Sequence, residues 1–102
     1  MSSREKVLGL IGLASRARKT ESGEFSAEKA VKSGKAFLLI TASDASLNTK
    51  EKFRNMCVFY NVPYYEYSDM ETLGHSIGRG FRAVCAITDH NFSDAVIRLI
   101  EQ

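Results

Sequence analysis

The chain has 102 residues, of which 44% are hydrophobic, so it has room for one domain, residues 1–102, with one core, and it is too apolar for a disordered chain. The net charge of +2 is unevenly divided: residues 1–35 hold eight Lys or Arg against four Glu, and residues 36–102 hold six against eight acidic residues. This asymmetry fits either an anionic partner at one end or a solvated basic face.

Cysteine content and apolar run lengths exclude further classes of protein. Cys57 and Cys85 are too few for a disulfide scaffold and lie in no cluster of metal ligands, so we predict two buried free thiols. No apolar run approaches the length that spans a bilayer, and residues 1–5 lack the apolar core of a signal peptide. We expect a cytoplasmic protein with no membrane contact, metal or cofactor.

The first predicted helix begins near Ser2, which has capping-box spacing to Glu5, and ends near Ala17. Glycine disfavours a helix interior, so Gly9 and Gly12 predict close packing against a neighbouring element. Cations gather near the C-terminal end, where they suit the helix dipole, a phosphate or solvent. These cations are Arg16, Arg18 and Lys19.

A short edge strand over residues 19–22 and a second helix are predicted next. Gly23 precedes this helix and Gly34 ends it, because glycine suits a left-handed cap. The apolar side of the helix is predicted to consist of Phe25, Ala27, Ala30 and Val31.

The most apolar stretch, residues 36–42, is too short for a helix and predicts a central strand covered on both faces. Phe37 and the three residues after it are expected to be buried. Asn48 has capping-box spacing to Glu51 and predicts the start of a third helix, which Asn61 closes. The apolar stripe of this helix comprises Phe53, Met56, Cys57 and Tyr60.

Four elements are predicted in the remaining chain. The first three are a strand over residues 64–67, a short helix that Ser68 and Glu71 open and Gly78 ends, and a strand over residues 83–87 after the basic loop 79–82. The last is a helix with an apolar face formed by Phe92, Ala95, Val96, Leu99 and Ile100. The alternation of helices and strands predicts an α/β fold: a three-layer α/β/α sandwich with a central mixed four-stranded sheet and helices on both faces.

The residues show no assembled enzyme site, and we expect a protein that is not an enzyme. His75 and His90 lack nearby ligand partners, and neither a nucleophile elbow nor a Walker loop is present. Asp44 follows the central strand, where it would border a ligand or cap a turn.

A nucleic-acid face is the remaining candidate. Gly23 allows close backbone approach, the helix after it presents free amides, and Lys29 and Lys32 add charge. The loop 79–82 supplies two more cations and Phe81 for stacking. A solvated basic helix beside a surface loop is the alternative.

Several motifs together resemble the L-seven-Ae and L-thirty-e ribosomal-protein family. They are Gly23, Lys29, Lys-Ser-Gly-Lys-Ala at 32–36, Ala-Ser-Asp at 42–44, Asn-Val-Pro-Tyr at 61–64, Leu-Gly-His-Ser-Ile-Gly at 73–78 and the strand 83–87. The resemblance covers nearly the whole chain. Leu-Gly-Leu at 8–10, Ala-Ser-Arg-Ala at 14–17, Lys19 and Ser-Gly-Glu at 22–24 are similar to the bacterial YlxQ-type branch.

This resemblance implies an α/β/α sandwich that binds structured RNA, typically a kink-turn, in ribosomal or another RNA. It implies a ribosome-associated or translation-related, non-enzymatic role, and we expect a monomer. The implied contact residues are Gly23, Glu24, Phe25, Ser26, Lys29, Lys32, Asp44, Ser46, Arg79, Gly80, Phe81 and Arg82.

The chain departs from the family pattern after Gly23. Tight kink-turn binders carry Asn-Glu two and three residues after this glycine, whereas Phe25 and Ser26 stand here. Losing two polar base contacts weakens discrimination by roughly 1 to 3 kcal/mol each if nothing replaces them. Phe25 packing inward and Glu24 acting as a substitute are the expectations at these positions. The rival hypothesis is a protein-interaction module on the same fold, with Phe25 and Phe81 in its contact patch.

Overall fold

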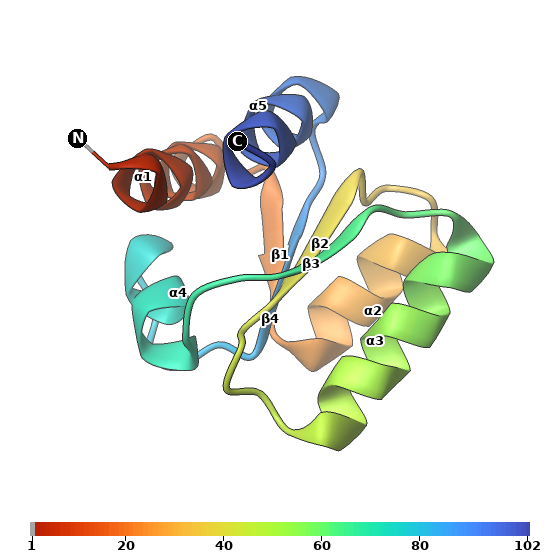
Figure 1. The fold of residues 1–102 in the computed structure, drawn as a ribbon. Helices are drawn as coiled ribbons and strands as arrows, with labels where there is room; N and C mark the ends of the chain where they lie inside the picture. Colours follow the sequence, from red (N-terminus) through yellow and green to blue (C-terminus); the bar gives the residue numbers. More distant parts are fainter. Residues whose placement is uncertain (1) are drawn as a thin grey trace.

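The computed structural model describes residues 2–102, in which five helices alternate with four strands (Figure 1). The helices are α1 (Ser3–Arg16), α2 (Glu24–Lys32), α3 (Leu47–Tyr60), α4 (Met70–Ser76) and α5 (His90–Ile100). The strands are β1 (Thr20–Ser22), β2 (Leu38–Thr41), β3 (Tyr64–Glu66) and β4 (Val84–Ile87). Within the described residues, no helix has the length and apolar character needed to cross a membrane.

The strands form one mixed sheet in the order β1-β4-β2-β3. β2 pairs in parallel with β3, whereas β4 runs antiparallel to both β1 and β2. Every residue of β2 and β4 is buried, as expected for central strands with both faces covered. The predicted mixed four-stranded sheet is confirmed.

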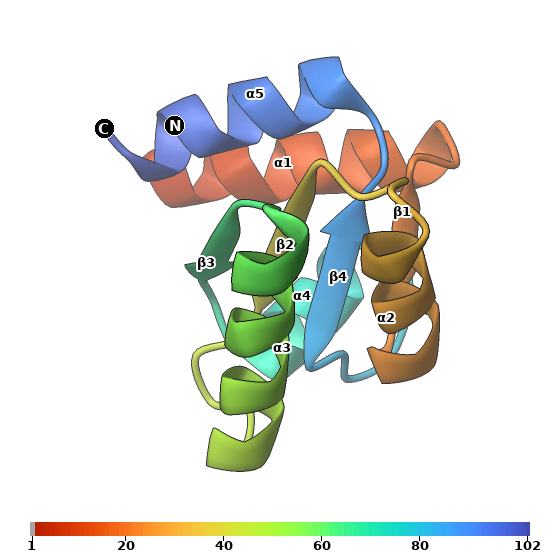
Figure 2. The same cartoon turned by 90° about the vertical axis from the view of Figure 1, so that its right-hand side faces the viewer.

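The sheet is covered on both faces, so the predicted three-layer α/β/α sandwich is also confirmed (Figures 1 and 2). On one face, Leu38 and Ile40 of β2 pack with α1, α4 and α5. On the other, Leu39 packs with α2 and α3, where Phe53 is the largest fully buried side chain. Successive strand residues thus supply two separate cores.

Burial of Cys57 and Cys85 as free thiols is confirmed.

The burial expected of Phe37 is wrong. Its side chain is 42% exposed, and its ring meets the edge of His90 with centroids 5.6 Å apart. The physical reason is that β2 begins only at Leu38, so Phe37 precedes the fully covered part of the sheet.

Two of the three predicted helix caps lie elsewhere. The Ser2–Glu5 capping box of α1 is present, but Ser46 rather than Asn48 caps α3, and Asp69 rather than Ser68 caps α4. An N-cap needs extended backbone, and Ser68 instead has φ +65°. The left-handed conformation predicted for Gly34 is confirmed by its φ of +78°, and Asn61 closes α3 as predicted, with φ +59°.

Candidate functional site

Gly23 joins β1 directly to α2 with φ +87° and ψ 156°, a backbone conformation that is essentially restricted to glycine. Its amide donates to the carbonyl oxygen of Val84 at 3.0 Å, and the space where a Cβ would stand is open. Among residues 2–102, no side chain caps α2, in contrast to the other helices. The first-turn amides of α2 therefore lack a side-chain partner.

The loop 78–82 lies beside this helix start, although it is distant in sequence. Arg82 donates from Nε to the Oγ of Ser22 at 3.3 Å, and its amide donates to the carbonyl oxygen of Met70 at 3.1 Å. The amide of Arg79 donates to Gly74 O at 2.8 Å, so both ends of the loop are held. Phe81 is 66% exposed, and Gly80 is exposed too. Most of the predicted basic loop is thus available to a partner.

A polar pocket of about 430 Å³, which we call the arginine pocket, lies between this loop, β1 and the C-terminal end of α1. Three arginines line it: Arg18, Arg79 and Arg82. Hydroxyl groups add further polar atoms, from Ser15, Thr20, Ser22 and Ser26. Glu21 contributes one carboxylate. Three cations against one carboxylate make this pocket suited to an anion.

Arg18 is the member of the arginine pocket that the sequence-derived contact set omits. It follows α1 with φ +61°, in the left-handed region that glycine usually occupies. The signal available in the sequence was its place among the cations of residues 16–19, which suited the helix dipole, a phosphate or solvent. Its convergence with Arg79 and Arg82 depends on the tertiary fold.

A smaller pocket of about 200 Å³, which we call the Phe25 pocket, adjoins the first, because Glu21 and Ser26 line both. Phe25, Lys29, Ser33 and Lys35 complete its polar and aromatic lining. Phe25 is 83% exposed, so the expectations that it lies on the apolar side of the helix and packs inward are wrong. The other three residues predicted for this side, Ala27, Ala30 and Val31, are buried as expected.

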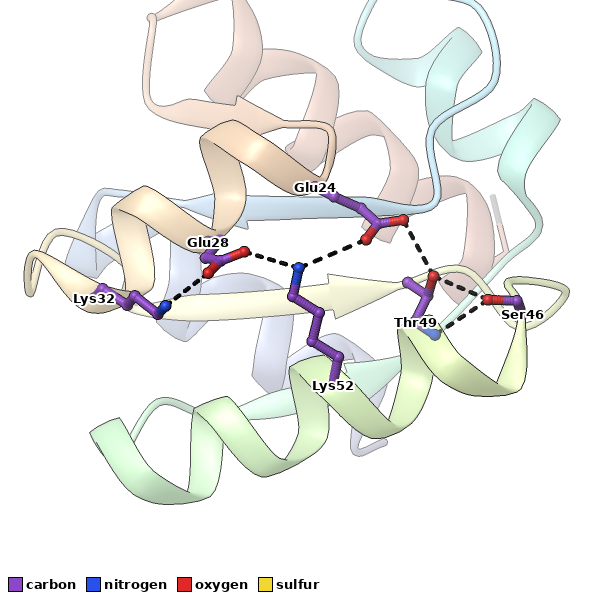
Figure 3. A network of polar contacts seen from close by, with 6 residues as sticks. All are labelled: Glu24, Glu28, Lys32, Ser46, Thr49 and Lys52. Carbon is purple, nitrogen blue, oxygen red and sulfur yellow. Dashed lines mark hydrogen bonds and ion pairs between the residues drawn. The ribbon is translucent and has the colours of Figure 1, made fainter.

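Glu24 and Lys32 point toward α3 and take part in a network of polar contacts, shown in Figure 3. Lys32 Nζ donates to Glu28 at 2.7 Å, and Lys52 of α3 pairs with the same carboxylate at 2.8 Å. Glu24 accepts from the hydroxyl of Thr49 at 3.1 Å. Hydrogen bonds from Lys32 and then Lys52 lower the pKa of Glu28 to about 2. Neither Glu24 nor Lys32 lines the two pockets.

Asp44 and Ser46 make local contacts beyond the central strand. The carboxylate of Asp44 accepts from the amide of Met70 at 2.8 Å, which ties the loop after β2 to the start of α4. The hydroxyl of Ser46 accepts from the amide of Thr49 at 3.1 Å. Neither residue lines the arginine pocket or the Phe25 pocket.

The two cysteine thiols are buried and are not activated as nucleophiles. Burial raises the pKa of Cys57 to about 11 and is the main reason that the pKa of Cys85 rises to about 12, so both thiols stay neutral at pH 7. In the part of the chain that the structure describes, no group of three or more His, Cys, Asp or Glu is placed to hold a metal ion.

Similar proteins were found by sequence and by structure. The chain is 41% identical to the RNA-binding protein YlxQ of Bacillus subtilis (strain 168), over 90% of this chain and 92% of that one. It is 36% identical to the RNA-binding protein YlxQ of Enterococcus faecium, over 97% and 95% respectively.

Two solved structures share the fold. A protein with unknown function from Bacillus halodurans C has a TM-score of 0.92 at 38% identity, with 95% of this chain and 98% of that one covered. The Giardia lamblia 15.5kD RNA binding protein has a TM-score of 0.80 at 24% identity, with 97% and 85% covered. A family model matches residues 5–97. The chain therefore belongs to the ribosomal protein L7Ae/L30e/S12e/Gadd45 family.

Proposed function

We propose that this chain binds structured RNA through the start of α2 and the loop 78–82. The observation that carries the proposal is the convergence of Arg18, Arg79 and Arg82 on one pocket, with Lys29 in the pocket beside it. Within residues 2–102, none of these four cations forms an ion pair. Unpaired cations can neutralise backbone phosphates, which supply most of the affinity for nucleic acids.

The family and the curated relatives give independent support for the proposal. The Bacillus subtilis and Enterococcus faecium relatives, at 41% and 36% identity, carry the name RNA-binding protein YlxQ. The resemblance to ribosomal proteins makes a kink-turn in ribosomal RNA the first RNA to test, in a role in translation. Phe25 offers no hydrogen bond to a base edge, and the hydroxyl of Ser26 does not reach as far as a Glu carboxylate, so preference for a kink-turn should fall by roughly 1 to 3 kcal/mol per lost contact.

The test is to measure the affinity of a short kink-turn RNA and of a plain duplex of equal length at several salt concentrations. Neutralising about four phosphates predicts a slope of log affinity against log salt of roughly −3 to −4. Lys29→Ala should weaken binding and make the slope shallower by about 1. Lys32→Ala removes the same charge from the same helix, but its ammonium is already paired with Glu28, so it serves as the matched control.

One result of this experiment supports the proposed surface and another refutes it. Salt-sensitive binding that Lys29→Ala weakens more than Lys32→Ala does supports the proposed surface. Absence of binding to either RNA at low salt would refute RNA binding through this surface.

A second candidate function is a protein-interaction module, which the exposure of Phe25 and Phe81 favours. In that case, Phe25→Ala and Phe81→Ala would abolish capture of a protein partner while leaving RNA affinity unchanged.

A further inference from the structure

The arginine pocket has the chemistry of a site for one phosphate group. Its three arginines come from the end of α1 and from the loop 78–82, and guanidinium forks match phosphate oxygens in pairs. Arg82 already donates from Nε to Ser22 and from Nη1 to the carbonyl oxygen of Phe81. Arg18 and Arg79 therefore supply the forks, and Arg82 adds its charge.

In contrast, Lys32 and Lys52 on the α3 side are already paired with Glu28, and Lys52 also pairs with Glu24. The electrostatic potential of the described surface is therefore positive at the arginine pocket, whereas carboxylates balance the lysine charges beside it.

The Phe25 pocket has the chemistry of a stacking site. An aromatic ring that is 83% exposed stands at the first turn of α2, and Lys29 and Lys35 lie in the same pocket. A flat exposed ring beside cations is the combination by which proteins hold unpaired bases, because every base has a face that can stack. A phenyl ring offers no hydrogen bond to a base edge, so stacking is the contact available to it.

The two pockets adjoin at Glu21 and Ser26, which line both. We propose that they hold one unpaired RNA nucleotide, with its phosphate in the arginine pocket and its base stacked on Phe25. The carboxylate of Glu21 repels phosphate at the shared border, which keeps the phosphate on the side of Arg18, Arg79 and Arg82. This inference rests on the proposed RNA-binding function and specifies the RNA element that the surface takes.

The nucleotide must be unpaired because a base inside a duplex already stacks on its neighbours and presents only its edges. Bulges, internal loops and strand ends free the face of a base. A continuous duplex could still contact the arginines through its phosphates but could not reach the ring of Phe25. Recognition by Phe25 therefore selects RNA with an interruption of pairing.

The first probe is an RNA hairpin with a three-nucleotide bulge, compared with the same hairpin without the bulge. A non-nucleotide linker closes both stems, so that neither hairpin has unpaired bases in its loop. Wild-type protein should prefer the bulged hairpin. Phe25→Ala should weaken its binding roughly ten- to a hundredfold and leave the uninterrupted hairpin unchanged, whereas Phe25→Tyr should retain the preference. Phe59→Ala is the matched control, because Phe59 is 80% exposed on α3 and packs edge-on against Tyr60.

Arg18→Ala tests the phosphate part of the site. It should weaken binding of the bulged hairpin and make the salt slope shallower by about 1. Arg98→Ala on α5 is the control, because Arg98 is exposed and lines neither pocket. Equal effects of the two substitutions would overturn the assignment of the phosphate to the arginine pocket.

A spectroscopic readout tests stacking directly. The chain contains no tryptophan, so Phe25→Trp introduces a single indole whose fluorescence should be quenched by the bulged hairpin. Replacing the bulged nucleotides by abasic ones should abolish the quenching and remove the penalty of Phe25→Ala. Quenching that persists with abasic nucleotides would overturn the stacking assignment.

The failure of this inference and the failure of RNA binding give different results. If wild type binds both hairpins equally, or if Phe25→Ala binds the bulged hairpin as wild type does, the unpaired-nucleotide site is refuted and RNA binding stands. If wild type binds neither hairpin at low salt, both proposals are refuted.

Discussion

Gly74 is a residue at which a single added methyl group would disturb the candidate site. It lies in α4, and a Cβ built there would overlap the carbonyl oxygen of Gly80 in the loop 78–82. The obstacle is backbone, which cannot swing aside as the end of a side chain can. The loop can therefore hold its position against α4 only with glycine at position 74.

Gly74→Ala should destabilise the protein by about 3 kcal/mol, at the upper end of the usual overpacking costs, and should weaken RNA binding because the loop carrying Arg79 and Arg82 must move. Urea unfolding and RNA titration measure the two effects. Gly9→Ala is the matched control: its Cβ would meet nothing within 4 Å, and alanine favours a helix by about 1 kcal/mol. Unchanged stability of Gly74→Ala would contradict the close approach.

Gly9 and Gly12 also show the limit of reasoning from single residues. The sequence predicts close packing at both, yet only Gly12 approaches a neighbour, with its Cβ position 2.8 Å from the carbonyl oxygen of Ser76. Both glycines lie in α1 and have the same helical propensity, so propensity does not distinguish them. Which one faces α4 depends on how the two helices pack.

At the scale of whole elements, the start of α3 shows how a helix selects its cap. Ser46 has φ −62° and ψ 154°, and its hydroxyl accepts from the amide of Thr49 at 3.1 Å. Asn48, which has the capping-box spacing in the sequence, lies inside the first turn. Spacing alone leaves both residues as candidates, and the backbone path out of β2 decides between them.

Ser46→Ala should lower the free energy of unfolding by about 1 kcal/mol, because an amide of the first turn loses its acceptor. Asn48→Ala should change stability by less than about 0.5 kcal/mol, because it removes no cap. Chemical denaturation of both variants under the same conditions provides the comparison. A larger loss for Asn48→Ala would place the cap where the sequence pattern suggests it.

At the scale of the whole molecule, ion pairs help to hold α2 against α3. Glu28 accepts from Lys32 at 2.7 Å and pairs with Lys52 at 2.8 Å, so its carboxylate links the two helices that cover one face of the sheet. Its folded-state pKa of about 2 lies below the ordinary value of 4.5. The unfolded chain therefore binds more protons in acid, and the stabilising contribution of Glu28 is lost as the pH falls from about 4.5 to about 2.

Glu28→Gln should reduce stability at pH 7, and the difference from wild type should shrink as the pH is lowered through this range. Thermal unfolding at pH 7, 4 and 2 measures the difference. Glu51→Gln is the control, because Glu51 is an exposed residue of α3 that forms no ion pair within the described residues. A difference between wild type and Glu28→Gln that does not change with pH would contradict the lowered pKa.

Local patterns in the sequence determined the order of elements and the fold class. The apolar run at 36–42 predicted a central strand, and helical spacing predicted each helix, because burial leaves a periodic trace in the sequence. The family motifs pointed to the start of α2 and the loop 78–82 in the same way. All of these signals lie within short segments, so they could be read without knowing how distant segments pack.

The tertiary structure alone decided which of those segments meet. It brought Arg18 together with Arg79 and Arg82, turned the ring of Phe25 outward, and directed Lys32 toward Glu28 and α3. Helical periodicity gives the buried side of a helix but does not say which exposed residue faces which neighbour. That choice follows from the strand order β1-β4-β2-β3 and from the packing of helices on both faces of the sheet, which no local pattern records.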